Sequence, residues 1–292
     1  MLLMVCILLG VLSGCAGGGN KTITIASKQF TENILLSEMY AQLVEKHTDL
    51  KVERKQNLGG TSVCFPAMEK GEIDVYVEYS GTAFNEILKL ENDGTKTSDD
   101  IYADAQSNLD SAHKITMFDP IGINNTFALG MLRSTAEERS IVTMSDLAAH
   151  SAEVKFGANH IFYTREADGY DAMSAKYGYN FSAAEKMDTS LLYEAIDNKQ
   201  LDVIVIYATD SLLVKYDMII LQDDLALFPA YHGSPICRNT TLETHPALKD
   251  VLNKLAGKID DATMQQLDYQ VDVEHKTPEE VAKQFLTDNG LL

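Results

Sequence analysis

The sequence lacks tryptophan and has few residues of the kinds that bind metals or cross-link chains. Its 292 residues include four cysteines, six prolines and seven scattered histidines. No cysteine or histidine spacing resembles a metal site, so we predict neither a metal nor any other cofactor. Basic residues are also scarce, because 24 Lys and Arg oppose 43 Asp and Glu, for a formal net charge of -19. Nucleic acid binding needs clustered basic residues, so we do not expect a nucleic acid partner.

The longest uncharged hydrophobic run lies at the N-terminus. The segment from Met1 to Leu12 is too short to cross a bilayer as a helix, and it is typical of a secretory signal, although no Lys or Arg precedes it. The small residues before Cys15 resemble the lipobox of bacterial lipoproteins, in which this cysteine is acylated. We therefore expect a signal peptide over 1–14, a lipidated tether over 15–21 and an extracytoplasmic protein anchored to the cell membrane. A signal peptide without lipidation is the alternative.

Two cysteines, Cys64 and Cys237, lie in the body of the chain. An oxidising location permits a disulfide between them. The sequence does not establish that their Cα atoms are close enough for one. We expect two buried thiols.

The body of the chain alternates between predicted strands and predicted helices. Thr31 is the expected N-cap of the first helix, and the tail over 242–286 is mostly helical. This alternation indicates a parallel sheet with crossover helices. Strands are predicted near 23–26, 51–55, 73–79, 154–158, 201–207 and 218–221.

Two segments rich in proline and glycine interrupt this alternation. They cover 118–122 and 228–235, and they indicate two crossings between lobes. We therefore predict an α/β protein of two lobes, with two parallel-rich sheets flanked by helices and a hinge of two segments. The first lobe would hold residues 22–123 and 228–292, and the second would hold residues 124–227.

A tyrosine ends two similar predicted strands. The segments 73–79 and 201–207 each begin with an apolar residue and an Asp, and each ends in Tyr five positions after that Asp. Ligands of open α/β sheets bind outside the carboxyl ends of the strands. Tyr79 and Tyr207 therefore predict a binding cleft between the lobes.

Four aromatic residues lie at predicted strand ends or crossings. Ring faces are negative, so they hold a cation that has no N–H donors, such as a quaternary ammonium, by about 0.5–2 kcal/mol per desolvated contact. Packing in the core is the alternative for each ring. The four residues are Tyr79, Phe127, Tyr207 and Tyr231.

Catalysis in the same cleft is the main rival interpretation. Ser211 and Ser234, with His160 or His232, supply the residue types of a nucleophile and a base. No Gly-x-Ser-x-Gly nucleophile elbow is present. We therefore predict a binding protein and not an enzyme.

Seven segments, in order along the chain, resemble the substrate-binding proteins of osmoprotectant ABC importers. The resemblance covers residues from about Thr22 to Leu286. It implies a bilobal periplasmic-binding-protein-like fold of type II. It also implies a quaternary ammonium ligand such as glycine betaine, choline or carnitine, and an ABC permease with its ATPase subunits as partners. The segments are SKQFTE (27–32), NLGGT (57–61), GEIDVYVEYSGT (71–82), NNTFAL (124–129), DGY (168–170), FPAY (228–231) and YQVD (269–272).

The resemblance also implies roles for single residues. The four aromatic residues match the cage of the family, with Phe127 in place of the commoner Tyr. Lys28 and Thr82 match positions that contact a ligand carboxylate. Arg165 matches a second-lobe residue linked to closure or to that carboxylate, and Asp171 is its expected partner.

Two further alternatives concern the role and the ligand. The first is a lipid-anchored sensor of the same ligands, and the second is a binding protein for another betaine such as ergothioneine. If Lys28 and Arg165 face the cleft, a zwitterion is preferred over choline, because choline has no carboxylate. We expect a monomer.

Overall fold

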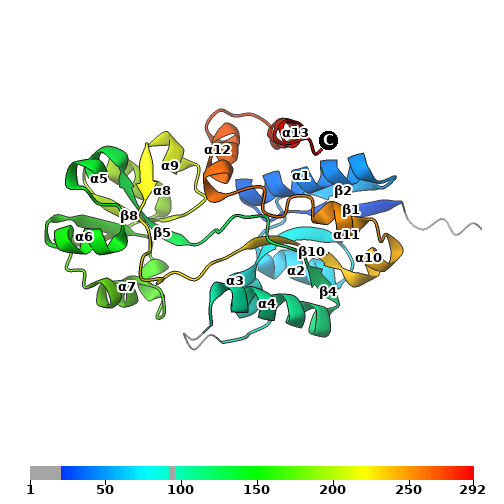
Figure 1. Cartoon of the computed structure of the whole chain (residues 1–292), viewed down its shortest axis with the longest axis horizontal. Coiled ribbons are helices and arrows are strands. Elements are labelled where there is room, and N and C mark those ends of the chain that lie inside the picture. The colour runs from blue at the N-terminus through cyan, green and yellow to red at the C-terminus, as the bar shows by residue number, and fades with distance from the viewer. Residues whose placement is uncertain (1–20, 92–95) are drawn as a thin grey trace, which may run out of the picture.

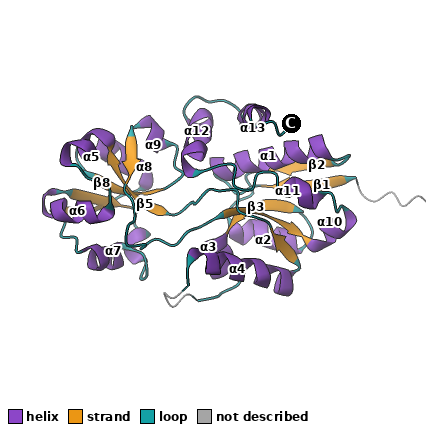
Figure 2. Ribbon diagram, in the orientation of Figure 1, coloured by secondary structure: helices purple, strands orange, loops and turns teal. Residues whose placement is uncertain are grey.

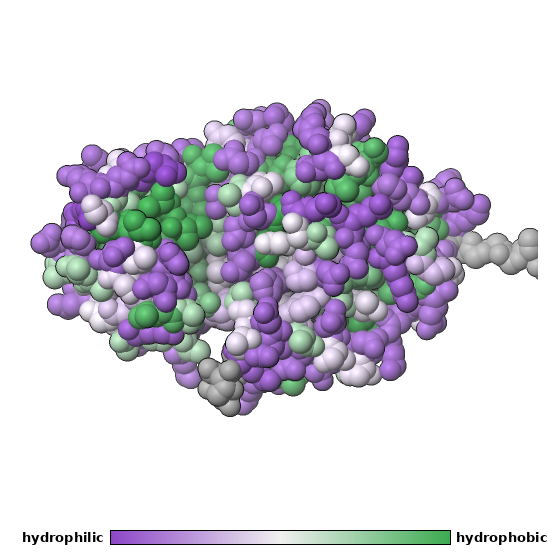
Figure 3. Space-filling model, viewed as in Figure 1, coloured by the Kyte–Doolittle hydropathy of each residue, from purple (hydrophilic) through white to green (hydrophobic). Residues whose placement is uncertain are grey.

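The computed structural model describes residues 21–91 and 96–292. The expected signal peptide and Cys15 therefore lie outside the described residues. The described chain forms two α/β lobes that two crossing segments connect (Figure 1). Hydrophilic side chains cover most of the face seen in Figure 3, which agrees with the acidic composition. No helix among the described residues has the length and apolar content needed to cross a membrane.

The first lobe is built on a five-stranded sheet in the order β2-β1-β3-β10-β4. The pairs β1–β2 and β1–β3 are parallel, whereas β10 is antiparallel to both of its neighbours. The strands are β1 (Thr22–Ala26), β2 (Lys51–Lys55), β3 (Val75–Tyr79), β4 (Ile115–Met117) and β10 (Gly233–Arg238).

The second lobe repeats this pattern in the order β7-β6-β8-β5-β9. Here β5 is the antiparallel strand, and like β10 it follows a crossing and holds the fourth place in its sheet. The predicted class of two parallel-rich α/β lobes is confirmed. The strands are β5 (Phe127–Leu132), β6 (Lys155–Ala158), β7 (Ala183–Lys186), β8 (Val203–Tyr207) and β9 (Met218–Ile220).

Helices flank both sheets (Figure 2). Around the first sheet these are α1 (Thr31–His47), α2 (Thr61–Glu69), α3 (Ser80–Thr82), α4 (Ser98–Asn108), α10 (Asn239–Thr244), α11 (Leu248–Leu252), α12 (Asp261–Asp272) and α13 (Pro278–Asp288). Around the second they are α5 (Arg133–Arg139), α6 (Met144–His150), α7 (Tyr170–Tyr177), α8 (Thr189–Asp197) and α9 (Leu212–Lys215). Short π-helical turns (Ala83–Ile87, Leu109–His113) and a 3-10 turn (Ser151–Glu153) extend α3, α4 and α6, and a separate 3-10 turn (Phe162–Thr164) precedes α7.

The N-cap expected at Thr31 is wrong. Thr31 is the first residue of α1 and Phe30 is the N-cap. The Thr31 hydroxyl instead donates to Asp272 Oδ1 at 2.6 Å, on the C-terminal part of the chain. Reciprocal capping boxes begin three other helices, and they pair Thr97 with Asp100, Thr143 with Asp146 and Thr277 with Glu280.

The predicted second crossing extends too far along the chain. Residues 233–235 belong to β10, a central strand, in which Pro235 lies opposite Val77 of β3. Proline and glycine usually mark turns. Here the carbonyl of Pro235 still accepts a ladder bond from Phe118 N–H at 3.0 Å, so the strand continues on that side.

The two body cysteines are free and buried, as expected. Cys237 packs in the cluster between the first sheet and α1, with Val75 and Leu36. Cys64 packs in the cluster on the other face of the same sheet, with Tyr76. Because the sheet separates the two thiols, a disulfide between them cannot form.

The two crossing segments pair with each other. Asn124 and His232 form an antiparallel bridge, and Asn125 N–H donates to the Tyr231 carbonyl at 3.2 Å. Helix α12 makes a third link, because Gln265 Nε2 donates to the carbonyl of Ala208 at 2.7 Å. The lobes are therefore connected by paired backbone and by one helix of the C-terminal tail.

Candidate functional site

A cavity of about 720 Å³ lies between the lobes, and side chains of both lobes line it. Seven of the eight predicted ligand-binding residues lie in its wall, and Asp171 does not. The lining residues are Lys28, Phe30, Thr31, Glu32, Gly60, Thr61, Ser62, Tyr79, Thr82, Glu86, Asn125, Phe127, Ile161, Arg165, Tyr207, Thr209, Asp210, Ser211, Tyr231, Asp268 and Asp272.

Tyr79 and Tyr207 occupy equivalent places. Each is the last residue of the third strand in its sheet, β3 or β8. Gly233 lies opposite Tyr79, and Phe127 lies opposite Tyr207. Tyr79 is 4% exposed whereas Tyr207 is 37% exposed, so the first ring is held in the wall and the second projects from it.

The rings of the second lobe form a continuous aromatic surface. Phe127 stacks on Tyr207 with ring centroids 5.0 Å apart and planes at 25°. The Arg165 guanidinium carbon lies 5.1 Å from the centre of the Phe127 ring, within the range of a cation–π contact. This part of the cavity wall therefore already holds a cation over a ring face.

Tyr231 comes from the second crossing and reaches the first lobe. Its ring packs against the backbone of Gly81, where an added Cβ would come within 2.4 Å of ring atom Cε1. The Tyr231 amide donates to Asn124 Oδ1 at 2.7 Å, which fixes the backbone below the ring. Only glycine at 81 leaves room for the tyrosine in this position.

The partner expected for Arg165 is wrong. The guanidinium makes two parallel hydrogen bonds of 2.6 Å with Asp168, and Asp171 is exposed at the start of α7. Hydrogen bonding to Asp168 raises the pKa of Arg165 above its ordinary value. Nη2 also lies 3.5 Å from the Tyr231 hydroxyl. Among the described residues Nη1 has no hydrogen bond, so that edge of the guanidinium is free for a ligand.

Lys28 is buried and already paired. It is 4% exposed, its ammonium forms an ion pair with Glu78, and its Nζ lies 4.9 Å from the centre of the Tyr79 ring. Glu78 also accepts hydrogen bonds from the Thr61 hydroxyl at 3.0 Å and from the Tyr79 amide at 2.8 Å. The pair thus fixes the lobe I wall and neutralises much of the charge that Lys28 would offer a ligand.

Sequence reasoning missed the acidic residues of the cavity. Burial raises the pKa of Glu32 and of Asp210, and it raises the pKa of Asp268 well above the ordinary range. Glu32 and Asp272 fall within segments that carry the family resemblance, 27–32 and 269–272, so that resemblance could have identified them. Asp210 and Asp268 give no such signal.

The cavity wall has an excess of negative charge. Its acidic residues number five, against the two basic residues Lys28 and Arg165, and both of these already pair with carboxylates. Such a wall attracts cationic solutes. Within the described residues no group of three or more His, Cys, Asp or Glu is arranged to hold a metal ion. The acidic residues are Glu32, Glu86, Asp210, Asp268 and Asp272.

Comparisons with known proteins agree on one family. The family described as "Substrate binding domain of ABC-type glycine betaine transport system" matches residues 21–288. The carnitine transport binding protein OpuCC of Listeria monocytogenes is 34% identical over 280 residues, which cover 96% of this chain and 90% of that protein. The ergothioneine transport permease/ergothioneine binding protein EgtU of Helicobacter pylori is 33% identical over 93% of this chain and 48% of its own length.

The fold of a solved structure is also similar. A crystal structure titled as a glycine betaine/carnitine/choline ABC transporter superposes with a TM-score of 0.87 at 32% identity. It covers 92% of this chain and 99% of its own. This likeness confirms the expected type II periplasmic-binding-protein-like fold.

Proposed function

The chain belongs to the family of substrate-binding domains of ABC-type glycine betaine transport systems, and we propose that its cleft binds a zwitterionic quaternary ammonium solute. Glycine betaine and carnitine are the leading ligands. A member of this family captures a solute outside the cytoplasm for a membrane permease. It is a binding protein and not an enzyme.

The observation that supports this ligand class is the convergence of rings from both lobes on one cavity. Tyr79 comes from the first sheet, Phe127 and Tyr207 come from the second, and Tyr231 comes from a crossing. A methylated ammonium donates no hydrogen bond, so ring faces and nearby carboxylates are the groups that stabilise it. The acidic excess of the wall supports a cationic head.

Arg165 is the proposed partner of the anionic end of the ligand. Its Nη1 edge is free among the described residues, and a planar guanidinium suits a carboxylate. Thr82 lines the same cavity and would donate its hydroxyl. Lys28 would act chiefly by holding Tyr79 and Glu78 in place, with its remaining N–H groups as further donors.

Ligand binding would favour closure of the lobes. The ring of Tyr79 and the guanidinium of Arg165 belong to different lobes, and one ligand touches both fully only when the lobes approach. We assign 22–123 and 228–292 to lobe I and 124–227 to lobe II, an assignment that the two sheets support.

The lipid anchor is a separate proposal. We propose that Cys15 is acylated after removal of 1–14, on the strength of the lipobox-like sequence alone. Labelling with a fatty acid would test it, with Cys15→Ala as the control that should lose the label.

Calorimetry with a panel of solutes tests the ligand class. Glycine betaine and carnitine are expected to bind more tightly than choline, because only they carry a carboxylate for Arg165. Ergothioneine in the same panel tests the alternative betaine. Absence of binding by every quaternary ammonium compound would overturn the proposal.

A further inference from the structure

Glu32 links a ring of the cleft to a crossing between the lobes. It is the second residue of α1 and is 3% exposed. Its Oε1 accepts a hydrogen bond from the Tyr79 hydroxyl and another, of 3.0 Å, from Asn125 Nδ2. Asn125 in turn donates its amide to the Tyr231 carbonyl. One carboxylate oxygen therefore joins the segments that carry two of the four rings.

Glu32 has no counter-cation among the described residues. Its Oε2 is buried and makes no hydrogen bond of normal geometry. Burial is the main cause that raises the pKa of Glu32, and Asp261 adds to it, whereas the side chain of Thr209 favours the ionised form. A buried carboxylate in these surroundings costs free energy of folding. It therefore calls for a reason beyond packing.

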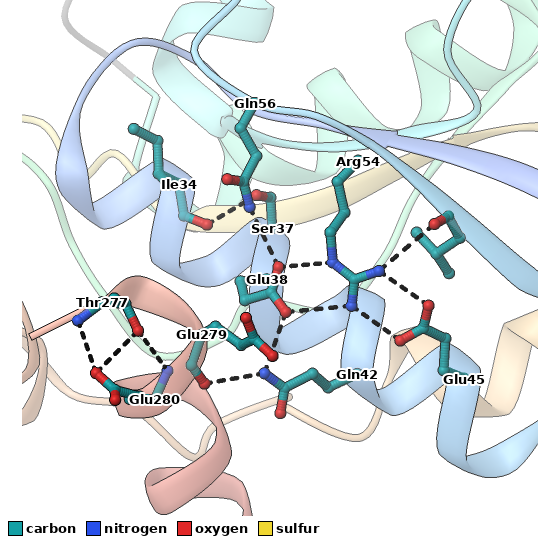
Figure 4. Close-up of polar contacts among 11 residues, drawn as sticks. Ile34, Ser37, Glu38, Gln42, Glu45, Arg54, Gln56, Thr277, Glu279 and Glu280 are labelled. Atoms are coloured by element: carbon teal, nitrogen blue, oxygen red, sulfur yellow. Dashed lines mark hydrogen bonds and ion pairs between the residues drawn. The ribbon is translucent and has the colours of Figure 1, made fainter.

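A second glutamate on the same helix shows the usual arrangement. Glu38 is also 3% exposed, but Arg54 contacts it through Nε at 2.8 Å and Nη2 at 3.2 Å (Figure 4). Gln42 and Gln56 add donors at 3.1 Å and 3.3 Å. Glu38, which does not line the cavity, is therefore buried together with a cation, Arg54. Glu32, which lines the cavity, is buried without one.

We propose that Glu32 is a positioning residue for cation binding, which holds Tyr79 in the wall and makes its ring face more negative. A phenol that donates a hydrogen bond to a carboxylate gains electron density in its ring, since hydrogen-bonded groups polarise one another in a low dielectric. A ring with more electron density holds a cation more strongly. The inference rests on the proposed function, because it requires a cation over Tyr79.

The charge state of Glu32 then matters for affinity. Only the ionised carboxylate polarises Tyr79 in this way, and a bound cation favours that ionised form. Burial raises the pKa of Glu32 above its usual value of 4.5, so protonation begins at a higher pH than for an exposed glutamate. Affinity for the cation should therefore rise with pH through this range. The charged or titratable groups around Glu32 and Tyr79 are Lys28, Glu78, Asp261 and Asp268, and Asp268 in turn interacts with Asp210 and Asp272.

The test compares Glu32→Gln with Tyr79→Phe, using glycine betaine as the probe from about pH 5 to about pH 8. The unmodified protein should bind more tightly as pH rises. Each variant should bind about threefold more weakly at the upper end and lose most of the slope. The double variant should lose little more than either single one, because both remove the same link.

Glu38→Gln is the matched control. It removes a buried carboxylate from the same helix and lowers the melting temperature, but it should keep both the affinity and the pH slope. Unchanged affinity and slope in Glu32→Gln would overturn the inference, as would loss of the slope in Glu38→Gln. Binding of glycine betaine in all variants would leave the proposed function standing in either case. If Glu32→Gln does not fold, Tyr79→Phe gives the decisive slope.

Discussion

The two lobes share one sheet pattern but offer the ligand different walls. In lobe I, Tyr79 lies opposite a glycine, is almost fully buried and donates its hydroxyl to a carboxylate. In lobe II, Tyr207 lies opposite Phe127, is partly exposed and belongs to an aromatic surface that also holds Arg165. The tyrosine at the end of the third strand is thus buried beside a carboxylate in lobe I, whereas in lobe II it is partly exposed on a surface that carries an arginine.

This difference orients a ligand that carries two charges. The carboxylates Glu32 and Asp272 come from helices α1 and α12 of lobe I, whereas Arg165 comes from lobe II. A zwitterion is therefore expected to direct its ammonium toward the acidic residues of lobe I and its carboxylate toward Arg165 of lobe II, with Thr82 as the second donor proposed for that carboxylate. Asymmetry between two similar lobes gives the site its polarity.

Removing the cation of lobe II should have the largest effect. Arg165→Ala is expected to weaken glycine betaine binding by about 2 kcal/mol, the range of a hydrogen bond to a charged group. Choline binding should change much less, because choline has no carboxylate. Calorimetry with both solutes checks this, and an equal loss for both would contradict the assigned orientation.

Removing a ring from lobe I should have the next largest effect. Tyr79→Ala is expected to weaken binding of every quaternary ammonium ligand by at least about 1 kcal/mol, and Tyr231→Ala by a similar amount. Titration by intrinsic fluorescence or calorimetry measures the change. Full affinity in both variants would remove the aromatic cage from the explanation.

A methyl group at Gly81 should displace the Tyr231 ring without removing it, and so test whether the position of that ring matters for affinity. Gly81→Ala places a Cβ against the Tyr231 ring, so the ring must move. We expect a loss of about 1 kcal/mol in affinity, a large share of the cation–π contribution of that ring. The melting temperature serves as the control, since a fall in affinity with intact folding identifies displacement of the ring.

The buried acidic residue Asp268 should also make the free energy of unfolding depend on pH. Asp268 has a folded-state pKa well above its ordinary value because of burial and of the neighbouring Glu32 and Asp272. The folded protein therefore retains a proton that the unfolded chain releases, and stability falls as pH rises toward the folded-state pKa. Asp268→Asn should raise the free energy of unfolding by about 1 kcal/mol near pH 8 and by less near pH 5. Thermal unfolding at the two pH values checks the sign.

The sequence predicted those elements that depend on a local pattern of residues. The Val-rich runs that end in Tyr79 and Tyr207 predicted two equivalent strands, and those strands position both rings. Long-range packing was not readable in the same way. The carboxylates Glu32 and Asp268 meet because α12 packs near α1, more than two hundred residues away along the chain. No local signal contains that contact.

Two errors show the same limit at shorter range. Arg165 pairs with Asp168, three residues on, because the turn before α7 brings the two side chains together, and Asp171 already points into solvent on that helix. Residues 233–235 carry the composition of a turn, but they form a strand because β3 pairs with them on one side and the amides of Phe118 and Ile121 donate to the carbonyls of Pro235 and Gly233 on the other. Neighbours in space decided both cases.

The placement of the two body cysteines has a consequence for how the protein is made. The two thiols are buried in different core clusters, on opposite faces of the first sheet. The described chain thus needs no oxidant to complete its fold. It can acquire the same structure in reducing and in oxidising surroundings, which removes one requirement from a protein that works outside the cytoplasm.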